Sequence, residues 1–246
     1  MAEIFENWVD ATFERWLAQL THQEIARALK ALTRDYVQRR TRLRGKALDG
    51  RGKRAAFALY YGMRHFILVR EVVAALDLSH DSPAQILDLG CGTGVGGAAW
   101  GLLCAGEPKI TGVDLSPDLL REAALTYRTL ELSGRTVCCH LSKLRWPRTA
   151  AHIIAAFTIN ELDEAVRERV WGELVKQKSL GGRTLIVEPL ATRITPWWCQ
   201  WAQRAEGLGG RADEFHFEVE LPERVHLLGK SAGLRPERLG ARTLCI

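Results

Sequence analysis

The sequence lacks the apolar run that a membrane-spanning helix needs, because none of its apolar stretches approaches ~18 residues. Its first ten residues carry three acids before any base and no apolar core, unlike a secretory signal. None of its six cysteines forms a C-x-x-C pair or takes zinc-finger spacing with histidine, and Cys138 and Cys139 are adjacent. These absences predict a cytoplasmic protein with reduced thiols and no metal site.

Acidic residues are scarce in the first part of the chain. Residues 1–70 carry 14 Lys and Arg against seven Asp and Glu, whereas residues 71–246 are slightly acidic. The whole chain of 246 residues has a formal net charge of +5. Its 47% of hydrophobic and 26% of charged residues are ordinary for a globular protein and exclude wholesale disorder.

Eight bases lie between residues 39 and 54, opposed only by Asp49. They are Arg39, Arg40, Arg42, Arg44, Lys46, Arg51, Lys53 and Arg54. Such a cluster binds phosphate backbones through counterion release, which favours RNA as a partner. The plainer interpretation is a solvated helix end, where bases complement the helix dipole. An acidic protein or a membrane surface is a third and weaker alternative.

The hydrophobic pattern divides the chain into two regions. Residues 1–80 show helical periodicity over 5–20, 21–40 and from Arg54 to Leu78, which predicts a helical accessory region. From residue 85 onward, helical patterns at 95–105, 117–132 and 162–178 alternate with short apolar runs at 86–89, 110–113, 136–140, 152–157 and 184–187. This alternation predicts an α/β domain over 81–246 with a mostly parallel, doubly wound sheet.

The C-terminal region is expected to add a helix over 222–232 and then a strand that ends at Ile246. We expect that strand to be the sixth of the sheet, with Phe215–Val219 as the candidate for a seventh.

Residues 86–94, ILDLGCGTG, form the most informative motif, in which an apolar strand runs into a glycine-rich turn before a helix. Glycines at such a turn let the backbone approach a ligand near a helix N-terminus. Asp114 ends the next strand, a position from which a carboxylate can bind ribose hydroxyls.

Two residues decide which cofactor this motif favours. The dinucleotide fingerprint needs glycine at position 95, where this chain has Val95. Asp88 stands just before the glycines, where its carboxylate disfavours a pyrophosphate and attracts an ammonium group. S-adenosylmethionine has an ammonium group, a ribose and no phosphate, so the residues favour it over a nicotinamide or flavin nucleotide.

The DLGCGTG turn followed by VDLS resembles the two most diagnostic motifs of the class I S-adenosylmethionine-dependent methyltransferases. The resemblance implies a Rossmann-like methyltransferase fold with S-adenosyl-L-methionine as cofactor. It places the glycines around the methionine moiety, Asp88 near the ammonium group and Asp114 on the ribose. After the third strand the family often has an acid near the adenine, and Ser142 is the nearest polar residue here. The implied cofactor-binding residues are Asp88, Gly90, Cys91, Gly92, Gly94, Asp114, Leu115 and Ser142.

Two polar residues follow the fourth predicted strand. In open α/β sheets the ligand lies at the carboxyl ends of the strands, so Asn160 and Glu161 are the catalytic candidates. Glu161 could instead be an N-terminal acid of the following helix. No Pro-Cys pair occurs to supply the nucleophile for pyrimidine C5 methylation, which favours a nitrogen or oxygen acceptor.

A narrower stretch, AAFTINEL followed by Trp171 and Val187-Glu-Pro189, resembles the methyltransferase-like proteins of the small ribosomal subunit. The segment from Trp198 to Arg204 resembles them too, and the likeness covers about residues 55–217. It implies an RNA methyltransferase acting on ribosomal RNA. A small-molecule methyltransferase with a helical lid and a ribosome assembly factor without turnover are the alternatives.

Three indoles stand after the fifth predicted strand, at Trp197, Trp198 and Trp201. They could stack on a nucleobase. Packing of a helix onto the domain is the favoured interpretation for most of them.

Overall fold

The computed structural model describes residues 2–38, 48–235 and 237–246. The chain divides into two compact units. The first comprises Met1–His65 and Glu218–Leu239, and the second comprises Phe66–Phe217 and Gly240–Ile246. The first unit thus combines the N-terminal helices with a segment from near the C-terminus. This grouping differs from the predicted division of the chain at residue 80. Among the described residues, no helix is both long and apolar enough to cross a membrane.

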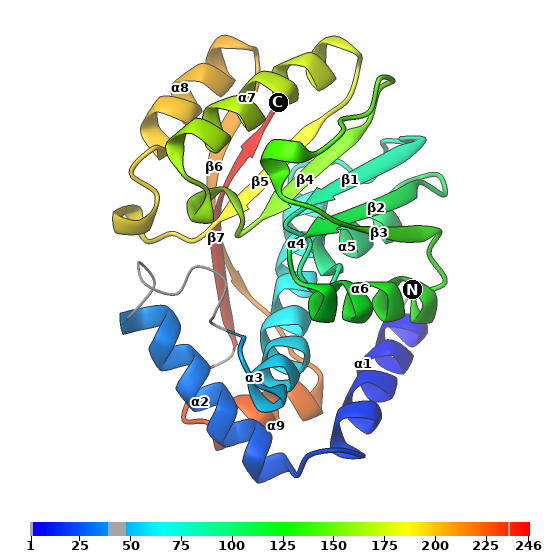
Figure 1. The fold of residues 1–246 in the computed structure, drawn as a ribbon, viewed down its shortest axis with the longest axis vertical. Helices are drawn as coiled ribbons and strands as arrows, with labels where there is room; N and C mark the ends of the chain where they lie inside the picture. Colours follow the sequence, from blue (N-terminus) through cyan, green and yellow to red (C-terminus); the bar gives the residue numbers. More distant parts are fainter. Residues whose placement is uncertain (1, 39–47, 236) are drawn as a thin grey trace. The chain divides into compact units, whose positions relative to one another are not determined.

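The second unit is built on a seven-stranded sheet with the order β3-β2-β1-β4-β5-β7-β6 (Figure 1). Its strands are β1 (Gln85–Leu89), β2 (Lys109–Asp114), β3 (Gly134–Cys138), β4 (His152–Ala156), β5 (Thr184–Glu188), β6 (Arg211–Glu218) and β7 (Arg238–Cys245). The pairs from β3 to β5 are all parallel, and β7 runs antiparallel to β5. The predicted α/β fold with a mostly parallel sheet is confirmed.

One helix precedes these strands, and the others connect them. They are α4 (Met63–Ala75), α5 (Val95–Leu103), α6 (Pro117–Thr129), α7 (Glu164–Ser179) and α8 (Trp198–Gly207), with 3₁₀ turns η2 (Leu141–Lys143), η3 (Ile159–Glu161) and η4 (Thr192–Ile194). The predicted start of α6 is confirmed, because Ser116 Oγ accepts the Leu119 N–H at 3.3 Å ahead of Pro117 at the first helical position.

Alternation along β1 sorts the helices onto two faces of the sheet. Leu87 and Leu89 belong to a buried cluster that also contains Trp171 of α7. Asp88 points the other way and accepts the backbone N–H of Gly97 in α5 at 2.7 Å. Because successive side chains of a strand face opposite sides, α5 and α7 cover opposite faces.

The order of the last two strands corrects one prediction. The C-terminal strand is β7, which lies between β5 and β6, and not the sixth strand. The strand before it is Arg211–Glu218, which starts four residues earlier than the predicted Phe215–Val219. β6 is only half-buried and interleaves charged with apolar residues, so its sequence shows no apolar run, whereas β7 is buried along most of its length.

The tryptophans after β5 serve packing, as favoured. Trp201 is fully buried, and Trp197 and Trp198 are 7% exposed. The Trp201 ring lies 4.8 Å from that of Trp171 and 4.9 Å from that of Trp197, both edge to face. These contacts fix α8 against α7.

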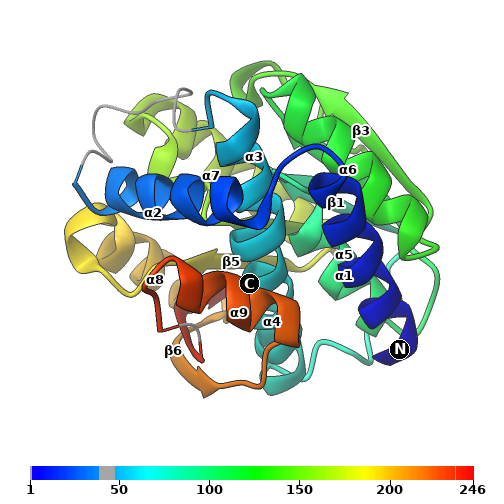
Figure 2. The same ribbon diagram turned by 90° about the horizontal axis from the view of Figure 1, so that it is seen from below.

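The first unit consists of helices. They are α1 (Ala2–Leu17), α2 (His22–Gln38), α3 (Arg51–Ala56), one turn of π-helix η1 (Phe57–Gly62), the start of α4, and α9 (Glu223–Ser231), which lies beside α2 (Figure 2). The predicted capping box is confirmed: Thr21 N–H donates to Glu24 Oε2 at 2.8 Å, and Glu24 N–H donates to Thr21 Oγ1 at 3.3 Å.

The third helix begins earlier than predicted. It starts at Arg51 rather than near Arg54, and Gly52 lies inside it instead of breaking it. A Cβ at Gly52 would lie only 3.2 Å from Ala28 Cβ, so this glycine permits the close approach of α2 and α3. The helical path then continues through η1 and α4 to Ala75.

Candidate functional site

The glycine motif forms a tight turn between β1 and α5. Gly90, Gly92 and Gly94 all have positive φ, at 62°, 53° and 79°. Gly94 caps α5 in the left-handed conformation, and a Cβ there would lie 2.9 Å from both Ala123 and Tyr127. The turn therefore needs glycine both for its conformation and for the room beside α6.

Asp114 is fixed at the carboxyl end of β2. Its Oδ2 accepts the Gly92 N–H at 3.0 Å, and its Oδ1 accepts the Ser116 N–H at 2.8 Å. A carboxylate has about four acceptor positions, so two are left for ribose hydroxyls. The residue predicted to bind the ribose is thus held directly against the glycine turn.

Asp88 lies beneath the turn rather than at its surface. The side chain is 1% exposed, and its Oδ2 accepts the Gly97 N–H. Burial raises the pKa of Asp88 to about 7, against the lowering effect of the Gly97 hydrogen bond and with a further increase from Asp114. Contact of Asp88 with the ammonium group stays a prediction.

Cys91 contributes its backbone to the turn and its side chain to the interior. Its N–H donates to Val113 O at 2.9 Å, and burial raises the pKa of its thiol well above the usual value. Only 6% of the residue is exposed. Any contact of Cys91 with the cofactor is therefore expected through the main chain.

The ends of β2 and β3 form the side on which the adenine is expected. Leu115 is 62% exposed directly after Asp114. Cys138 Sγ lies 3.6 Å from Leu115 O. Ser142 lies in η2, where its Oγ is 2.6 Å from Nδ1 of His140. The predicted residues Leu115 and Ser142 thus follow two neighbouring parallel strands.

The segment after β4 lies against the glycine turn. Phe157 has φ of 59°, a rare conformation for a bulky residue. The Thr158 hydroxyl donates a hydrogen bond to Gly90 O at 3.3 Å, and a Cβ at Gly90 would collide with the Thr158 side chain. The segment after β4 is therefore packed directly against the glycine turn at the carboxyl ends of β1 and β4.

Asn160 is bound by a carboxylate, Glu188, that is not among the predicted site residues. Its backbone N–H donates to Glu188 Oε1 at 3.1 Å, and its Nδ2 donates to Glu188 Oε2. Glu188 ends β5 and is fully buried. An acid at the end of an otherwise apolar strand was the sequence signal that could have identified it.

Glu161 lies in η3 and is exposed. It is not the N-terminal acid of α7, because that helix begins at Glu164 and is capped by Asp163, whose Oδ1 accepts the Val166 N–H at 2.9 Å. That alternative for Glu161 is wrong. Its role in catalysis stays a prediction.

Of the predicted RNA-binding residues, Arg39, Arg40, Arg42, Arg44 and Lys46 lie outside the described residues. The other three lie on α3 in the first unit. Arg51 is exposed, and Lys53 Nζ forms an ion pair with Asp35 Oδ2 at 2.7 Å. Part of the charge at Lys53 is therefore already balanced within the unit.

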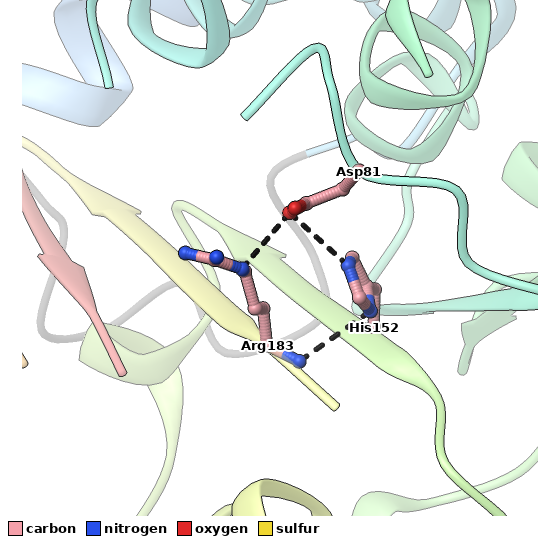
Figure 3. Close-up of polar contacts among 3 residues, drawn as sticks. All are labelled: Asp81, His152 and Arg183. Carbon is pink, nitrogen blue, oxygen red and sulfur yellow. Dashed lines mark hydrogen bonds and ion pairs between the residues drawn. The ribbon is translucent and has the colours of Figure 1, made fainter. Parts of the chain in front are cut away.

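A second cluster of titratable groups lies at the amino ends of the strands (Figure 3). Asp81 Oδ2 contacts His152 Nε2 at 3.2 Å and Arg183 Nε at 3.0 Å. The Arg183 backbone N–H donates to His152 Nδ1 at 3.4 Å, so Nε2 carries the hydrogen that Asp81 accepts. Burial lowers the pKa of His152, against the raising effect of Asp81. With both ring nitrogens engaged, this cluster stabilises the sheet.

Comparison with known protein families decides the assignment. Residues 86–182, from β1 through α7, match the model of a methyltransferase domain. The strand order, the glycine turn and the placement of Asp114 agree with that match. Residues 86–182 therefore form a methyltransferase domain, and the motifs of the chain resemble those of the class I S-adenosylmethionine-dependent methyltransferases. The cofactor of this chain is S-adenosylmethionine, and the protein is a methyltransferase.

Several solved methyltransferases overlap with this chain. The S-adenosylmethionine-dependent methyltransferase of Thiobacillus denitrificans, solved with S-adenosylhomocysteine, has a TM-score of 0.47 at 15% identity and covers 73% of this chain and 90% of that chain. The methyltransferase of Geobacter sulfurreducens, also solved with S-adenosylhomocysteine, has a TM-score of 0.46 at 18% identity and covers 73% of this chain and 89% of that chain. The Aquifex aeolicus methyltransferase has a TM-score of 0.46 at 15% identity and covers 72% of this chain and 91% of that chain. No curated protein sequence matches the chain.

The residues of this methyltransferase fit S-adenosylmethionine. The fixed carboxylate of Asp114 suits the ribose, and the exposed Leu115 offers an apolar surface for the adenine. When bound, the cofactor supplies an electrophilic methyl group on a sulfonium. In the described parts of the chain, His, Cys, Asp and Glu side chains form no group that could hold a metal ion.

Proposed function

We propose that this methyltransferase acts on RNA, with ribosomal RNA of the small subunit as its substrate and a nitrogen or oxygen as acceptor. The observation that carries the proposal is the basic cluster, eight bases within residues 39–54 opposed by one acid. Phosphate backbones attract such a cluster, and each phosphate contact adds to the salt dependence of binding. The resemblance to methyltransferase-like proteins of the small ribosomal subunit supports the choice of RNA.

The distribution of charge further supports a phosphate-rich partner. Residues 71–246, which include almost all of the methyltransferase unit, are slightly acidic, so that part of the chain has no net attraction for a polyanion. The basic cluster belongs to the part of the chain that precedes the glycine motif. RNA binding and cofactor binding are therefore expected to depend on different residues.

The test is incubation of the protein with purified small ribosomal subunits and with naked ribosomal RNA, using methyl-labelled S-adenosylmethionine. We expect label in RNA, and mass spectrometry of the nucleosides identifies the acceptor atom. No label in either substrate, with S-adenosylhomocysteine binding intact, contradicts the proposal. Turnover on small molecules would then favour the lidded small-molecule enzyme, and binding to the subunit without turnover would favour the assembly factor.

Charge reversal tests the basic cluster directly. In the variant Arg42→Glu, Arg44→Glu, Arg51→Glu we expect RNA binding and its salt dependence to fall steeply, with S-adenosylhomocysteine affinity unchanged. Lys53 is left in place because of its ion pair with Asp35. The matched control, Lys109→Glu, Arg128→Glu, Arg169→Glu, changes the net charge equally at exposed positions of the second unit. Equal RNA affinity in the two variants would show that the cluster is only a solvated face.

A further inference from the structure

Glu188 and Asn160 form a two-point clamp at the carboxyl ends of β5 and β4. Both oxygens of the Glu188 carboxylate are used: Oε1 accepts the Asn160 backbone N–H at 3.1 Å, and Oε2 accepts from Nδ2. Glu188 is fully buried, whereas Asn160 is half-buried. Burying a carboxylate costs free energy unless it is hydrogen-bonded, so the two hydrogen bonds between Glu188 and Asn160 are expected to persist.

The clamp fixes which side of the Asn160 amide is presented. A carboxylate only accepts hydrogen bonds, so Nδ2 must face Glu188 and Oδ1 is turned away from it. Among the described residues, Oδ1 has no hydrogen-bonding partner in the structure, and it is not a buried atom. Asn160 therefore offers a fixed hydrogen-bond acceptor at the edge of the sheet where the substrate is expected.

We propose that Glu188 is a positioning residue that makes the Asn160 amide oxygen an acceptor for the amino group that receives the methyl group. The inference rests on the proposed function and narrows its acceptor to an exocyclic amino nitrogen of a base. An amide oxygen accepts a hydrogen bond without taking the proton, which suits a nucleophile that needs no base before it attacks. Ring nitrogens without hydrogen and ring carbons cannot use this acceptor, and a hydroxyl needs deprotonation.

The step balances without a further reagent. The amino lone pair forms the bond to the methyl carbon, and the bond from carbon to sulfur breaks with its electron pair going to sulfur. The sulfonium becomes the neutral thioether of S-adenosylhomocysteine. The methylated nitrogen then gives one proton to water. Asn160 orients the amino group during attack, and Glu188 touches neither the substrate nor the reacting atoms.

Reversal of the clamp tests this inference. In Glu188→Gln, the new side-chain amide faces Asn160, so the Asn160 amide is expected to turn and present Nδ2. We expect kcat on small ribosomal subunits to fall on the order of 100-fold, with KM, S-adenosylhomocysteine affinity and melting temperature nearly unchanged. Asn160→Asp opposes two carboxylates and is expected to lose activity as well.

The double variant Asn160→Asp, Glu188→Gln restores the arrangement. The glutamine amide introduced on β5 then donates to one oxygen of the aspartate introduced in η3, and the second oxygen of that aspartate takes the place of the asparagine Oδ1. We expect its kcat to return to within about tenfold of wild type, a non-additivity typical of residues in one network. Glu164→Gln, at an exposed position in the first turn of α7, is the control for loss of a nearby carboxylate and is expected to keep full activity.

The outcomes separate this inference from the proposed function. An N-methyl group on an exocyclic amino nitrogen, together with rescue by the double variant, supports the inference. A methyl group on a ring nitrogen, a carbon or a ribose oxygen overturns this inference but still supports the proposed RNA methyltransferase activity. A double variant no better than the weaker single variant also overturns it. If the wild-type protein labels no RNA, the proposed function fails, and this inference fails with it.

Discussion

Asp114 accepts the Gly92 backbone N–H at 3.0 Å, so the end of β2 holds the glycine turn that follows β1. The same carboxylate accepts the Ser116 N–H at the entrance to α6. One side chain therefore connects the two motifs from which the cofactor was inferred. A change to this carboxylate is therefore expected to weaken ribose binding and to loosen the glycine turn at the same time.

Asp114→Asn tests that connection. An amide has one oxygen, so one of the two backbone N–H groups loses its acceptor, and the variant also loses a charge-assisted bond to the ribose. We expect S-adenosylhomocysteine affinity to fall by roughly 10- to 100-fold in calorimetric titration, since such a bond contributes about 1.5–3 kcal/mol. Asp118→Asn, four residues away on α6, is the matched control and is expected to bind as the wild type does. Equal affinities for the two variants would contradict the assignment of Asp114.

Cys138 reports on the adenine side of the site. It is exposed, and its Sγ lies 3.6 Å from Leu115 O. We expect S-adenosylhomocysteine to slow alkylation of Cys138 by N-ethylmaleimide several-fold, because the ligand covers the surface around Leu115. Cys199 is exposed on α8 and serves as the internal control, since its rate is expected to stay constant. Peptide mass spectrometry measures both rates in one sample, and equal protection at both sites would place the ligand elsewhere.

Asp88 links stability to pH. Burial raises the pKa of Asp88 to about 7 in the folded protein, whereas the carboxyl of the unfolded chain titrates near 3.8. Between these values the unfolded chain releases a proton that the folded protein retains, so this group makes stability fall as pH rises from about 4 to 7.

Asp88→Asn removes that titration. Relative to wild type, the variant is expected to gain stability as pH is raised from about 4 to 7, and then to show a constant difference above about 8. Urea unfolding at a series of pH values measures the difference. Glu107→Gln, at an exposed position of the second unit, is the control and is expected to follow the wild-type profile. Parallel profiles for Asp88→Asn and wild type would show that Asp88 titrates normally.

Asp81 is expected to matter for stability and not for cofactor binding. Its Oδ2 contacts both His152 and Arg183 at the amino ends of the strands (Figure 3). Asp81→Asn is expected to lower the free energy of unfolding by about 1–3 kcal/mol, since a largely buried hydrogen-bonded charge is lost. S-adenosylhomocysteine affinity is expected to stay unchanged, and a loss of affinity larger than the loss of stability can explain would place this cluster in the site.

Periodicity predicted most of the second unit because its strands are buried on both faces. β1, β2, β4 and β5 coincide with the apolar runs to within one or two residues, and the glycine turn was expected where it lies. β6 was misplaced because tertiary pairing, rather than hydrophobicity, defines an edge strand such as Arg211–Glu218. The start of α3 was missed because packing against Ala28 offsets the poor helix propensity of Gly52.

The candidate site was predictable in its cofactor half and less so in its substrate half. Asp114 ends the strand that follows the glycine motif, a position and distance typical of a ribose-binding acid, so the sequence pattern identified it together with the glycines. Glu188 is 28 residues from Asn160 along the chain. Only the parallel pairing of β4 with β5 brings the two strand ends together, and a single sequence does not display that pairing.

The composition of the two units has a consequence for synthesis on the ribosome. Helices α1 and α2 are made first, yet α9, which contacts α2 and whose Arg224 pairs with Asp10 at 2.8 Å, is made some 200 residues later. β7 likewise enters between two strands that are already made. The aromatic faces of the early helices must wait for residues 218–239 to emerge, so nascent chains stalled before residue 218 are expected to be the species that chaperones bind.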